Sequence, residues 1–423
     1  MFRAYKYRLY PTEKQEILLA KHFGCARFIW NWALEKKTTA YQLNKTKLSR
    51  FDLQAFIPIL KKQTETEWLK EVNSATLQAK LEDLEKAFNS FFRKKTAYPK
   101  FKSKKNRQSF RNPQSTKFDF KNSKVSIPKF LEGIKITVDR EFTGETSSSF
   151  IEKTCSGKYF ISILVEDGTS IPEKPAIKEE TTLGIDLGIR NFITTSSGLK
   201  VKYDKPSKTQ LVKLAKEQRK LSKKAKGSKN RNKQRIKVAK LQEYTVNKRK
   251  DFQHKLAFKL THDKQVDTIC METLSIKHML ENHEIESREV KSKKQLKELH
   301  RSISSMAWGM FVNILKNKCE WYGKNFIQIG RFEPSSKLCG CGFLNYKLKL
   351  SDKVWECPKC KAVNDRDLLA ANNIKLIGLE QPESKASGPT LDLSGKAAQA
   401  VGLKEEASAL KQSSSYNNIQ LKQ

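Results

Sequence analysis

The stretch TTLGIDLGIRNFITTSSG, residues 181–198, decides the fold of this 423-residue chain. Its apolar run ends in Asp186 and is followed by glycines, a second β-like run and a Ser-Ser-Gly turn. This pattern predicts a pair of strands that presents one carboxylate. An unpaired carboxylate at the end of an apolar strand is costly, so a cation, a metal ion or an arginine is expected beside it.

Two further segments carry acids in comparable places. In VDTICMETL an apolar run leads into Glu272 at the end of a second predicted strand, and NDRDLLAANNI places Asp365 and Asp367 directly before a helix. Acids on separate elements are what a two-metal phosphodiesterase requires, because two Mg²⁺ ions about 3.5–4 Å apart flank the scissile phosphate. For each acid taken singly a salt bridge explains the residue equally well, and spacing in the sequence does not show that the acids meet.

The chain is strongly basic, with 83 Lys and Arg residues against 45 Asp and Glu residues, a formal charge of +38 and a sequence pI near 9.8. Such a charge favours a polyanionic partner, because phosphate contacts dominate the affinity of nucleic-acid-binding proteins. A basic protein with solvated lysines is the plainer alternative. A membrane partner is not expected, since no apolar run of about 20 residues is found.

Basic residues interleaved with aromatic ones mark the candidate nucleic-acid contacts. Aromatic rings stack on nucleobases while Lys and Arg side chains follow the phosphates. The first ten residues and the stretch YPKFKSKKNRQSF have this composition, and residues 205–250 form a second basic segment. The candidate residues are Lys6, Arg8, Lys100, Lys102, Lys104, Lys105, Arg107, Lys223, Lys224, Lys229, Arg231 and Arg249.

The cysteines indicate a structural metal site. The first residues lack the apolar core of a secretion signal, so we expect the protein in a reducing compartment, the prokaryotic cytosol or nucleoid, where disulfides are rare. Two close pairs, Cys339-Gly-Cys341 and Cys357-Pro-Lys-Cys360, predict one tetrahedral Zn²⁺ that folds a segment too short for its own core. The other four cysteines are interpreted as buried thiols without an assigned function.

Residue patterns predict the remaining organisation. Residues 1–10 alternate as a strand, Thr12 and Gln15 form a capping-box start of a helical segment, and short alternating runs recur up to about residue 168. The simplest arrangement is a β-barrel with a helical insertion. The second basic segment reads as a helical hairpin that turns near Gly227, and the tail rich in Ser, Ala and Gly is expected to be disordered.

From residue 1 to about 376 these pieces together resemble the TnpB (OrfB) family of transposon-encoded RNA-guided DNA endonucleases, related to compact type V CRISPR effectors. The resemblance rests on KYRLYPTEKQ, GCARFIWNWAL and YPKFKSKK in the first half, and on GIDLGIRNF, METL, CPKC and DRDLLAANNI in the second. It implies a multidomain α+β and α/β fold, in which a wedge-type β-barrel with a helical insertion precedes an RNase H-like (RuvC) domain that a zinc segment interrupts.

On this resemblance each part of the chain has an expected place. We expect the wedge-type barrel at residues 1–10 and 105–170, the helical recognition lobe at 11–104, a linker at 171–180, the RuvC nuclease domain at 181–333 and 363–376, a zinc-binding target-strand-loading segment at 334–362, and a disordered tail at 377–423.

The resemblance also implies an activity. Asp186, Glu272 and Asp367 match the family's three catalytic acids and Mg²⁺ ligands, with Asp367 preferred over Asp365 because the family's acid directly precedes the x-x-Ala-Ala stretch. The implied reaction is two-metal cleavage of DNA beside a short transposon-adjacent motif, directed by a transposon-derived guide RNA that the protein binds as a monomer. Two positions depart from the family pattern: the first cysteine pair is C-x-C where C-x-x-C is usual, and Leu369 replaces an asparagine.

Two alternative functions stay open at this point. A nuclease-inactive or weakly active relative would bind RNA and DNA as a repressor, although such proteins normally lose one of the three acids, and all three are present here. A transposition-associated strand-transfer protein would also use a carboxylate triad on an RNase H-like fold. The residues alone do not separate cutting from joining.

Overall fold

The protein is represented by a computed structural model that describes residues 1–381, except 106, 204–207, 282–292, 332 and 350–351. The chain forms two compact units. The first comprises residues 1–173, 204–260 and 320–323, and the second comprises 174–203, 261–319 and the residues from 324 onward. Within the described residues no helix is both long and apolar enough to cross a membrane.

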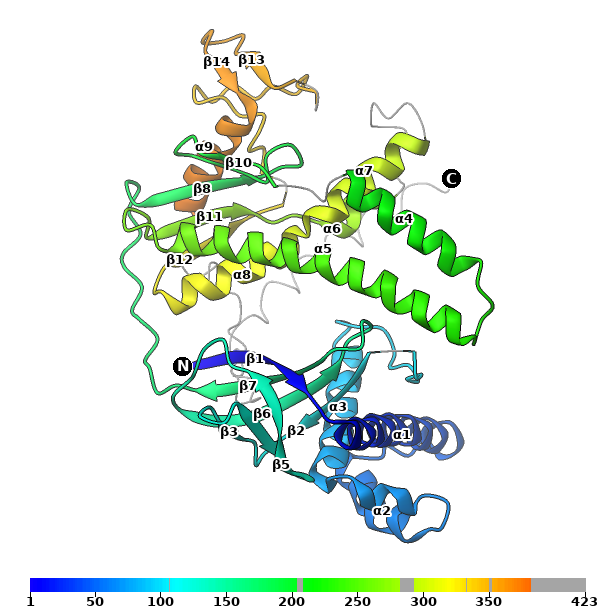
Figure 1. The fold of residues 1–423 in the computed structure, drawn as a ribbon. Helices are drawn as coiled ribbons and strands as arrows, with labels where there is room; N and C mark the ends of the chain where they lie inside the picture. The colour runs from blue at the N-terminus through cyan, green and yellow to red at the C-terminus, as the bar shows by residue number, and fades with distance from the viewer. Residues whose placement is uncertain (106, 204–207, 282–292, 332, 350–351, 382–423) are drawn as a thin grey trace, which may run out of the picture. The chain divides into compact units, whose positions relative to one another are not determined.

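A strongly curled antiparallel sheet is the centre of the first unit (Figure 1). Alternate residues of its strands point inward, and a buried core that includes Tyr7, Phe110 and Ile161 fills the interior. The side chains of Thr116 and Ser149 meet at 2.7 Å, which ties the segment before β3 to β6. In spatial order β2-β6-β7-β1-β5-β4-β3, the strands are β1 (Phe2–Tyr10), β2 (Gln108–Asn112), β3 (Lys117–Asp119), β4 (Lys124–Ile127), β5 (Phe130–Thr137), β6 (Glu145–Lys153) and β7 (Tyr159–Glu166).

Helices are inserted in the chain between β1 and β2. Thr12 and Gln15 form the predicted capping box: the Thr12 side chain accepts from the Gln15 backbone, and the Gln15 side chain accepts from the Thr12 backbone. The inserted elements are α1 (Glu13–Asn44), α2 (Arg50–Lys62), the 3₁₀ helix η1 (Glu67–Glu71) and α3 (Ser74–Phe92), which enclose an apolar core of their own.

The second basic segment forms two helices, α4 (Lys208–Ser222) and α5 (Lys229–Thr261). Gly227 adopts a left-handed backbone conformation with φ of 89° between them, so the predicted hairpin turn is confirmed. Arg231 donates from Nη1 to the carbonyl oxygens of Leu221 (2.6 Å) and Lys224 (2.7 Å) at the end of α4. This arginine therefore satisfies free helix-terminal carbonyls.

A mixed five-stranded sheet forms the core of the second unit, with β8, β11 and β12 parallel and β9 and β10 antiparallel to their neighbours. In the order β10-β9-β8-β11-β12, the strands are β8 (Thr182–Leu187), β9 (Ile193–Thr195), β10 (Lys200–Val201), β11 (Thr268–Glu272) and β12 (Asn325–Ile329). The helices that begin in this unit are α6 (Ile276–Met279), α7 (Lys293–Met306), α8 (Trp308–Trp321) and α9 (Arg366–Leu379).

Helix α9 lies directly against this sheet (Figure 1). A side chain at Gly184 of β8 would collide with the backbone of α9 at Ala371, and one at Gly378 of α9 would collide with Cys270 of β11. Close helix–sheet contact thus depends on a glycine from each partner. The helix continues to Leu379, three residues into the predicted disordered tail, and residues 382–423 of that tail lie outside the described residues.

Candidate functional site

Asp186 and Glu272 lie side by side at the ends of neighbouring parallel strands. Ile185 of β8 is in register with Met271 of β11, so the next residue of each strand reaches the same level and the same face. Neighbouring strands are about 4.8 Å apart, which makes the two carboxylates adjacent. The face that they share is the one that α9 covers, because Gly184 and Cys270, two residues earlier in each strand, contact that helix.

Asp367 approaches the same place from the first turn of α9. The helix and β8 contact each other at Ala371 and Gly184. From Gly184 the strand rises about 7 Å to Asp186, and from Ala371 the helix extends about 6 Å back to Asp367. At the other end of the contact, Lys375 Nζ lies 3.8 Å from Glu179 Oε1, so helix and strand run in opposite directions. The two aspartates are therefore brought toward the same end of the sheet.

The electrostatics of the site link the three acids in a row. Burial, with a second contribution from the nearby Asp367, raises the pKa of Asp186 to about 6, although Arg366 and Lys353 act in the opposite direction. Burial also raises the pKa of Glu272 to about 7, with a second contribution from Asp186. Raised pKa values of this kind mean that the positive charges of the protein do not offset the cost of burying these two carboxylates in their ionised form.

The three carboxylates do not close into one compact cluster. Among the described residues, one group of Cys, His, Asp or Glu side chains is close enough to hold an ion, and its members are the four cysteines rather than these acids. Asp186 instead interacts with Asp367 and with Glu272, which makes it the central member of the row. Carboxylate oxygens are the ligands that Mg²⁺ prefers, and incompletely neutralised acids suit divalent ions.

Asp365 has a different role from Asp367. Its Oδ1 accepts from the backbone of Asp367 (3.1 Å) and Leu368 (3.0 Å), so it is the N-cap of α9, and its Oδ2 lies 2.6 Å from Lys200 Nζ. Burial alone would raise the pKa of Asp365, but the bonds from Lys200 and the helix backbone hold it below its usual value. Both oxygens of Asp365 are thus already engaged, which supports the preference for Asp367.

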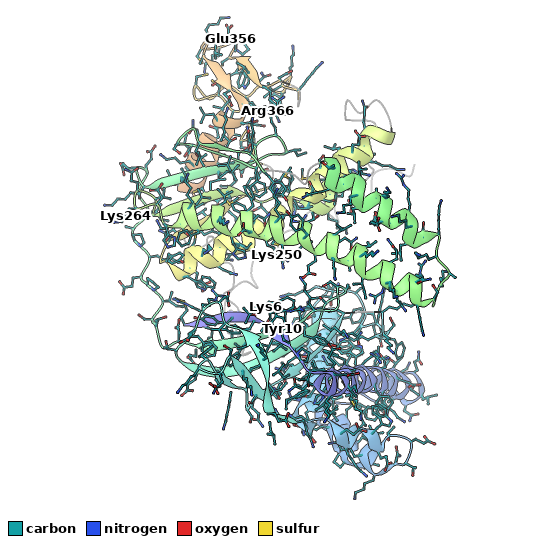
Figure 2. The ribbon with its side chains drawn as sticks, viewed as in Figure 1. Lys6, Tyr10, Lys250, Lys264, Glu356 and Arg366 are labelled. Atoms are coloured by element: carbon teal, nitrogen blue, oxygen red, sulfur yellow. The ribbon has the colours of Figure 1, made fainter. Side chains whose placement is uncertain are left out.

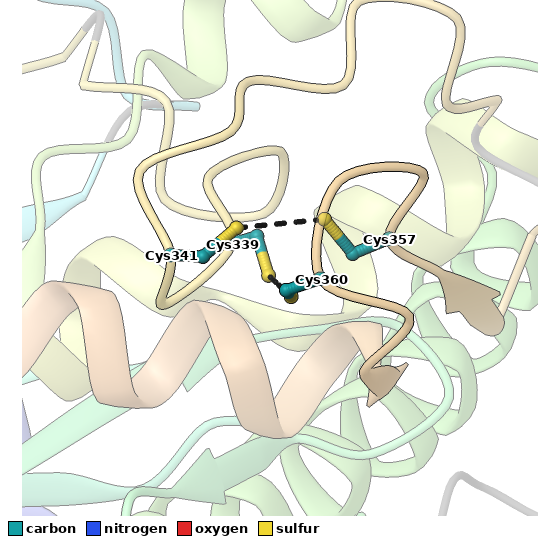
Figure 3. Close-up of side chains that lie close together, drawn as sticks. All are labelled: Cys339, Cys341, Cys357 and Cys360. Carbon is teal, nitrogen blue, oxygen red and sulfur yellow. Dashed lines mark hydrogen bonds between the residues drawn. The ribbon is translucent and has the colours of Figure 1, made fainter.

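The four cysteines of the two predicted pairs converge (Figure 3). Their sulfur atoms all lie within 4.8 Å of one another, with 3.7 Å between Cys339 and Cys360 and 3.6 Å between Cys341 and Cys357. Tetrahedral Zn²⁺ with Zn–S bonds of about 2.3 Å places sulfurs about 3.8 Å apart. The cluster fits a structural zinc ion, and the short C-x-C spacing does not prevent its formation.

Residues 334–362, which carry the four cysteines and are called the cysteine segment below, are attached to α9 by contacts that the sequence did not reveal. Asn373, which is buried, donates to the carbonyl oxygens of Ser335 and Leu338, each at 2.6 Å. Leu369 packs against the apolar cluster of Cys339, Trp355 and Cys357. The leucine that departs from the family pattern therefore contacts the zinc segment. The repeated asparagines of the AANN stretch were a possible signal for the first contact.

The predicted contacts on β1, Lys6 and Arg8, lie on the outer face of the curled sheet, because the alternate residues Tyr7 and Leu9 point into the core. Lys6 Nζ lies 4.7 Å and the Arg8 guanidinium 5.2 Å from the centre of the Phe160 ring of β7. Lys6 also pairs with Glu152. Figure 2 labels Lys6 and Tyr10 on this strand. Cations and rings thus lie together on one face, an arrangement that suits nucleic-acid binding.

The other candidate contacts differ in exposure. Lys102 is half-buried, with Nζ 3.4 Å from the centre of the Trp30 ring, and burial lowers its pKa to about 8. Arg107 pairs with Glu152. Lys224, Arg231 and Arg249 are partly covered. The exposed members are Lys100, Lys104, Lys105, Arg107, Lys223 and Lys229.

Three models of protein families match the chain. They are OrfB_IS605, described as "Probable transposase", over residues 162–283; HTH_OrfB_IS605, a "Helix-turn-helix domain", over residues 1–46; and the "Cas12f1-like, TNB domain" over residues 308–374. Despite the second description, residues 1–46 form strand β1 and one long helix. The third match covers the four clustered cysteines and Asp367.

The second unit combines a sheet and a helix, α9, that carry three acids with a cluster of four cysteines. Proteins of similar sequence show the family to which this chain belongs. A protein of Streptomyces pristinaespiralis, provisionally named an RNA-guided DNA endonuclease, is 37% identical over 89% of both chains. The protein InsQ of Escherichia coli (strain K12), also provisionally named an RNA-guided DNA endonuclease, is 29% identical. The match covers 89% of this chain and 92% of InsQ. The solved structure "Cryo-EM structure of the Cas12f1-sgRNA-target DNA complex" has a similar fold, with a TM-score of 0.51, 13% identity, and coverage of 89% of this chain and 98% of that one. The chain belongs to the TnpB (OrfB) family of transposon-encoded RNA-guided DNA endonucleases.

Proposed function

We propose that this protein is an RNA-guided DNA endonuclease that hydrolyses DNA beside a short transposon-adjacent motif, with Asp186, Glu272 and Asp367 as its catalytic acids. The observation that carries the proposal is the row of three acids at one end of the second unit's sheet, two of them with raised pKa values. The provisional names of the relatives support the same activity.

The proposed cofactor of the acid site is a pair of Mg²⁺ ions. Asp186, which interacts with both other acids, would be the shared ligand, with Glu272 and Asp367 as outer ligands. Bound Mg²⁺ stabilises negative charge on the attacking and leaving oxygens of a phosphodiester. The chain's own contribution is to hold three carboxylates on two strands and a helix N-terminus, where Asp365 fixes the first turn of α9.

The proposed partners are a guide RNA of transposon origin and the target DNA, bound by a protein monomer in the prokaryotic cytosol. The charge of +38 and the cationic, ring-bearing face around Phe160 support a nucleic-acid surface in the first unit. Base pairing by the RNA would supply sequence specificity, and the protein would read backbone shape and the adjacent motif. One Zn²⁺ on the four cysteines would be structural.

The proposed architecture follows the family. The curled sheet fits a wedge-type barrel, residues 11–104 a recognition lobe, and the five-stranded sheet with α9 an RNase H-like (RuvC) domain that the cysteine segment interrupts. Residues 171–180 would link the two parts.

Strand transfer is a second candidate, which the description of the matching family as a probable transposase favours. A nuclease-inactive repressor is less well supported, because all three acids are present. Cleaved ends and joined ends are different products, so one assay separates cutting from joining.

The test is guided cleavage by the full chain with RNA that copurifies with it. After that RNA is sequenced and its guide segment replaced, a plasmid with the new target should be cut in Mg²⁺ by wild type, and not by D186N or E272Q. The matched control is D251N, at an exposed acid on α5, which should cut normally. Absence of specific RNA, or full cleavage by D186N, would contradict the proposal.

A further inference from the structure

Lys353 joins the cysteine segment to the acid site. Its Nζ lies 3.6 Å from Asp367 Oδ1, and its side chain is 43% exposed against 22% for the aspartate. Its positive charge also lowers the pKa of Asp186. The neighbouring cation Lys200 is held by Asp365 at 2.6 Å, so the two lysines serve different acids.

The position of Lys353 is set by its backbone. Its carbonyl oxygen accepts from the backbone N–H of Arg366 at 2.8 Å, just before β13 (Val354–Glu356) pairs with β14 (Val363–Asp365). This two-stranded ladder leads directly into α9 and Asp367. Figure 2 labels Glu356 and Arg366, the residues that end β13 and begin α9.

The cysteine cluster stabilises the same ladder. Trp355, two residues after Lys353, is buried with Cys339 and Cys357. Asn364 Nδ2 lies 3.7 Å from the sulfur of Cys339. A zinc ion on the four thiolates would therefore fix the strand that presents Lys353 to the acids.

We propose that Lys353 is a positioning residue that occupies the acid site as a resident cation and gives way when divalent ions bind. This inference rests on the proposed metal-dependent function. A partly exposed lysine–carboxylate pair contributes little net stability, so displacement of Lys353 costs little. Its ammonium is a flexible point charge that offsets the repulsion between Asp186 and Asp367 until the ions arrive.

The consequence is a competition between lysine and metal ion. Loss of the charge in K353Q should tighten the binding of a divalent ion by up to about fivefold, the factor that corresponds to about 1 kcal/mol. K353R keeps the charge and should bind the ion as wild type does. K361Q is the matched control, because Lys361 lies in the same cysteine segment and pairs with Glu356 rather than with the acid site.

The experiment measures Mn²⁺ binding to the full chain by electron paramagnetic resonance, and the shift in melting temperature that Mn²⁺ causes. K353Q should bind Mn²⁺ more tightly and show a larger shift than wild type, K353R and K361Q, with equal zinc content in all four. Mn²⁺ affinity in K353Q that is equal to or weaker than wild type would overturn the inference, as would tighter binding by K353R.

The same experiment separates this inference from the proposed function. D367N should weaken Mn²⁺ binding if the acids hold the ions. Equal binding by wild type and D367N would reject the acid site and the role of Lys353 together. Weakened binding by D367N with no effect of K353Q would reject the role of Lys353 alone.

Discussion

Gly184 of β8 lies so close to Ala371 of α9 that a β-carbon at Gly184 would collide with the carbonyl oxygen of Ala371. This contact sets the distance between β8, which carries Asp186 next to its last residue, and α9, which carries Asp367 in its first turn. Everything proposed for the acid site depends on this close approach.

We therefore predict that G184A destabilises the second unit and reduces cleavage. Backbone atoms cannot rotate away as a flexible side chain does, so the helix must shift, and overpacking of this kind costs about 1–3 kcal/mol. Thermal unfolding and single-turnover cleavage measure the two effects. The control is G309A in α8, because a β-carbon at Gly309 meets no neighbour within 4 Å. This substitution should leave the stability unchanged or increase it. Wild-type stability in G184A would contradict the predicted contact.

The raised pKa values predict how stability depends on pH in Mg²⁺-free buffer. Because the folded pKa values of Asp186 (about 6) and Glu272 (about 7) exceed their usual values near 4, the folded state binds protons more tightly than the unfolded state. Stability should thus decrease as the pH rises from about 4 to 7, by about 3 kcal/mol for Asp186. Denaturant unfolding of wild type and of the D186N/E272Q double variant tests this.

The double variant should lose most of this pH dependence and be the more stable protein at pH 8, because neutral amides avoid the cost of burying two charged carboxylates and the repulsion between Asp186 and Asp367 is removed. An equally steep decrease in both proteins would show that other groups cause it.

The cysteine cluster predicts the effect of removing zinc. Replacement of Cys357 and Cys360 by serine should release bound zinc and destabilise residues 334–362, because the local apolar core is small. Elemental analysis and hydrogen exchange measure these outcomes. C155S, at an exposed cysteine outside the cluster, should keep its zinc. Unchanged metal content in the double variant would refute the zinc site.

The difference in exposure between basic residues predicts different effects on RNA binding. Lys104 and Lys105 are exposed, so alanine at both should weaken RNA binding and reduce the slope of log K against log salt by about 1–2. Lys102 covers the Trp30 ring, so K102A should lower stability and leave the slope nearly unchanged. A salt titration with the copurified RNA measures the slopes. A larger slope change for K102A than for the double variant would reverse this assignment.

Much of the acid site was predictable because apolar strands that end in acids are easy to recognise. The sequence pointed to Asp186 and Glu272 as acids at strand ends, and the structure places each of them directly after the paired residues Ile185 and Met271 of adjacent strands. Whether they are catalytic stays a prediction. The cysteine pairs were equally clear, because four thiols in two close pairs have few other uses in a reducing compartment.

Other features depended on where side chains point, which composition does not encode. The guanidinium of Arg231 caps the end of α4 through Nη1, which the sequence did not indicate, and its contact with nucleic acid stays a prediction. Lys102 belongs to an aromatic and basic run, yet it packs on Trp30. Lys353 gave no signal at all, since its contact with Asp367 arises only when the β13–β14 ladder forms.

The most direct measurement of the central claim is the electron paramagnetic resonance spectrum of the Mn²⁺-loaded complex with guide RNA and a target that cannot be cleaved. The proposed site predicts a magnetically coupled pair of ions about 3.5–4 Å apart in wild type, lost in D186N. A spectrum of isolated ions only, or an identical coupled pair in D186N, would contradict it.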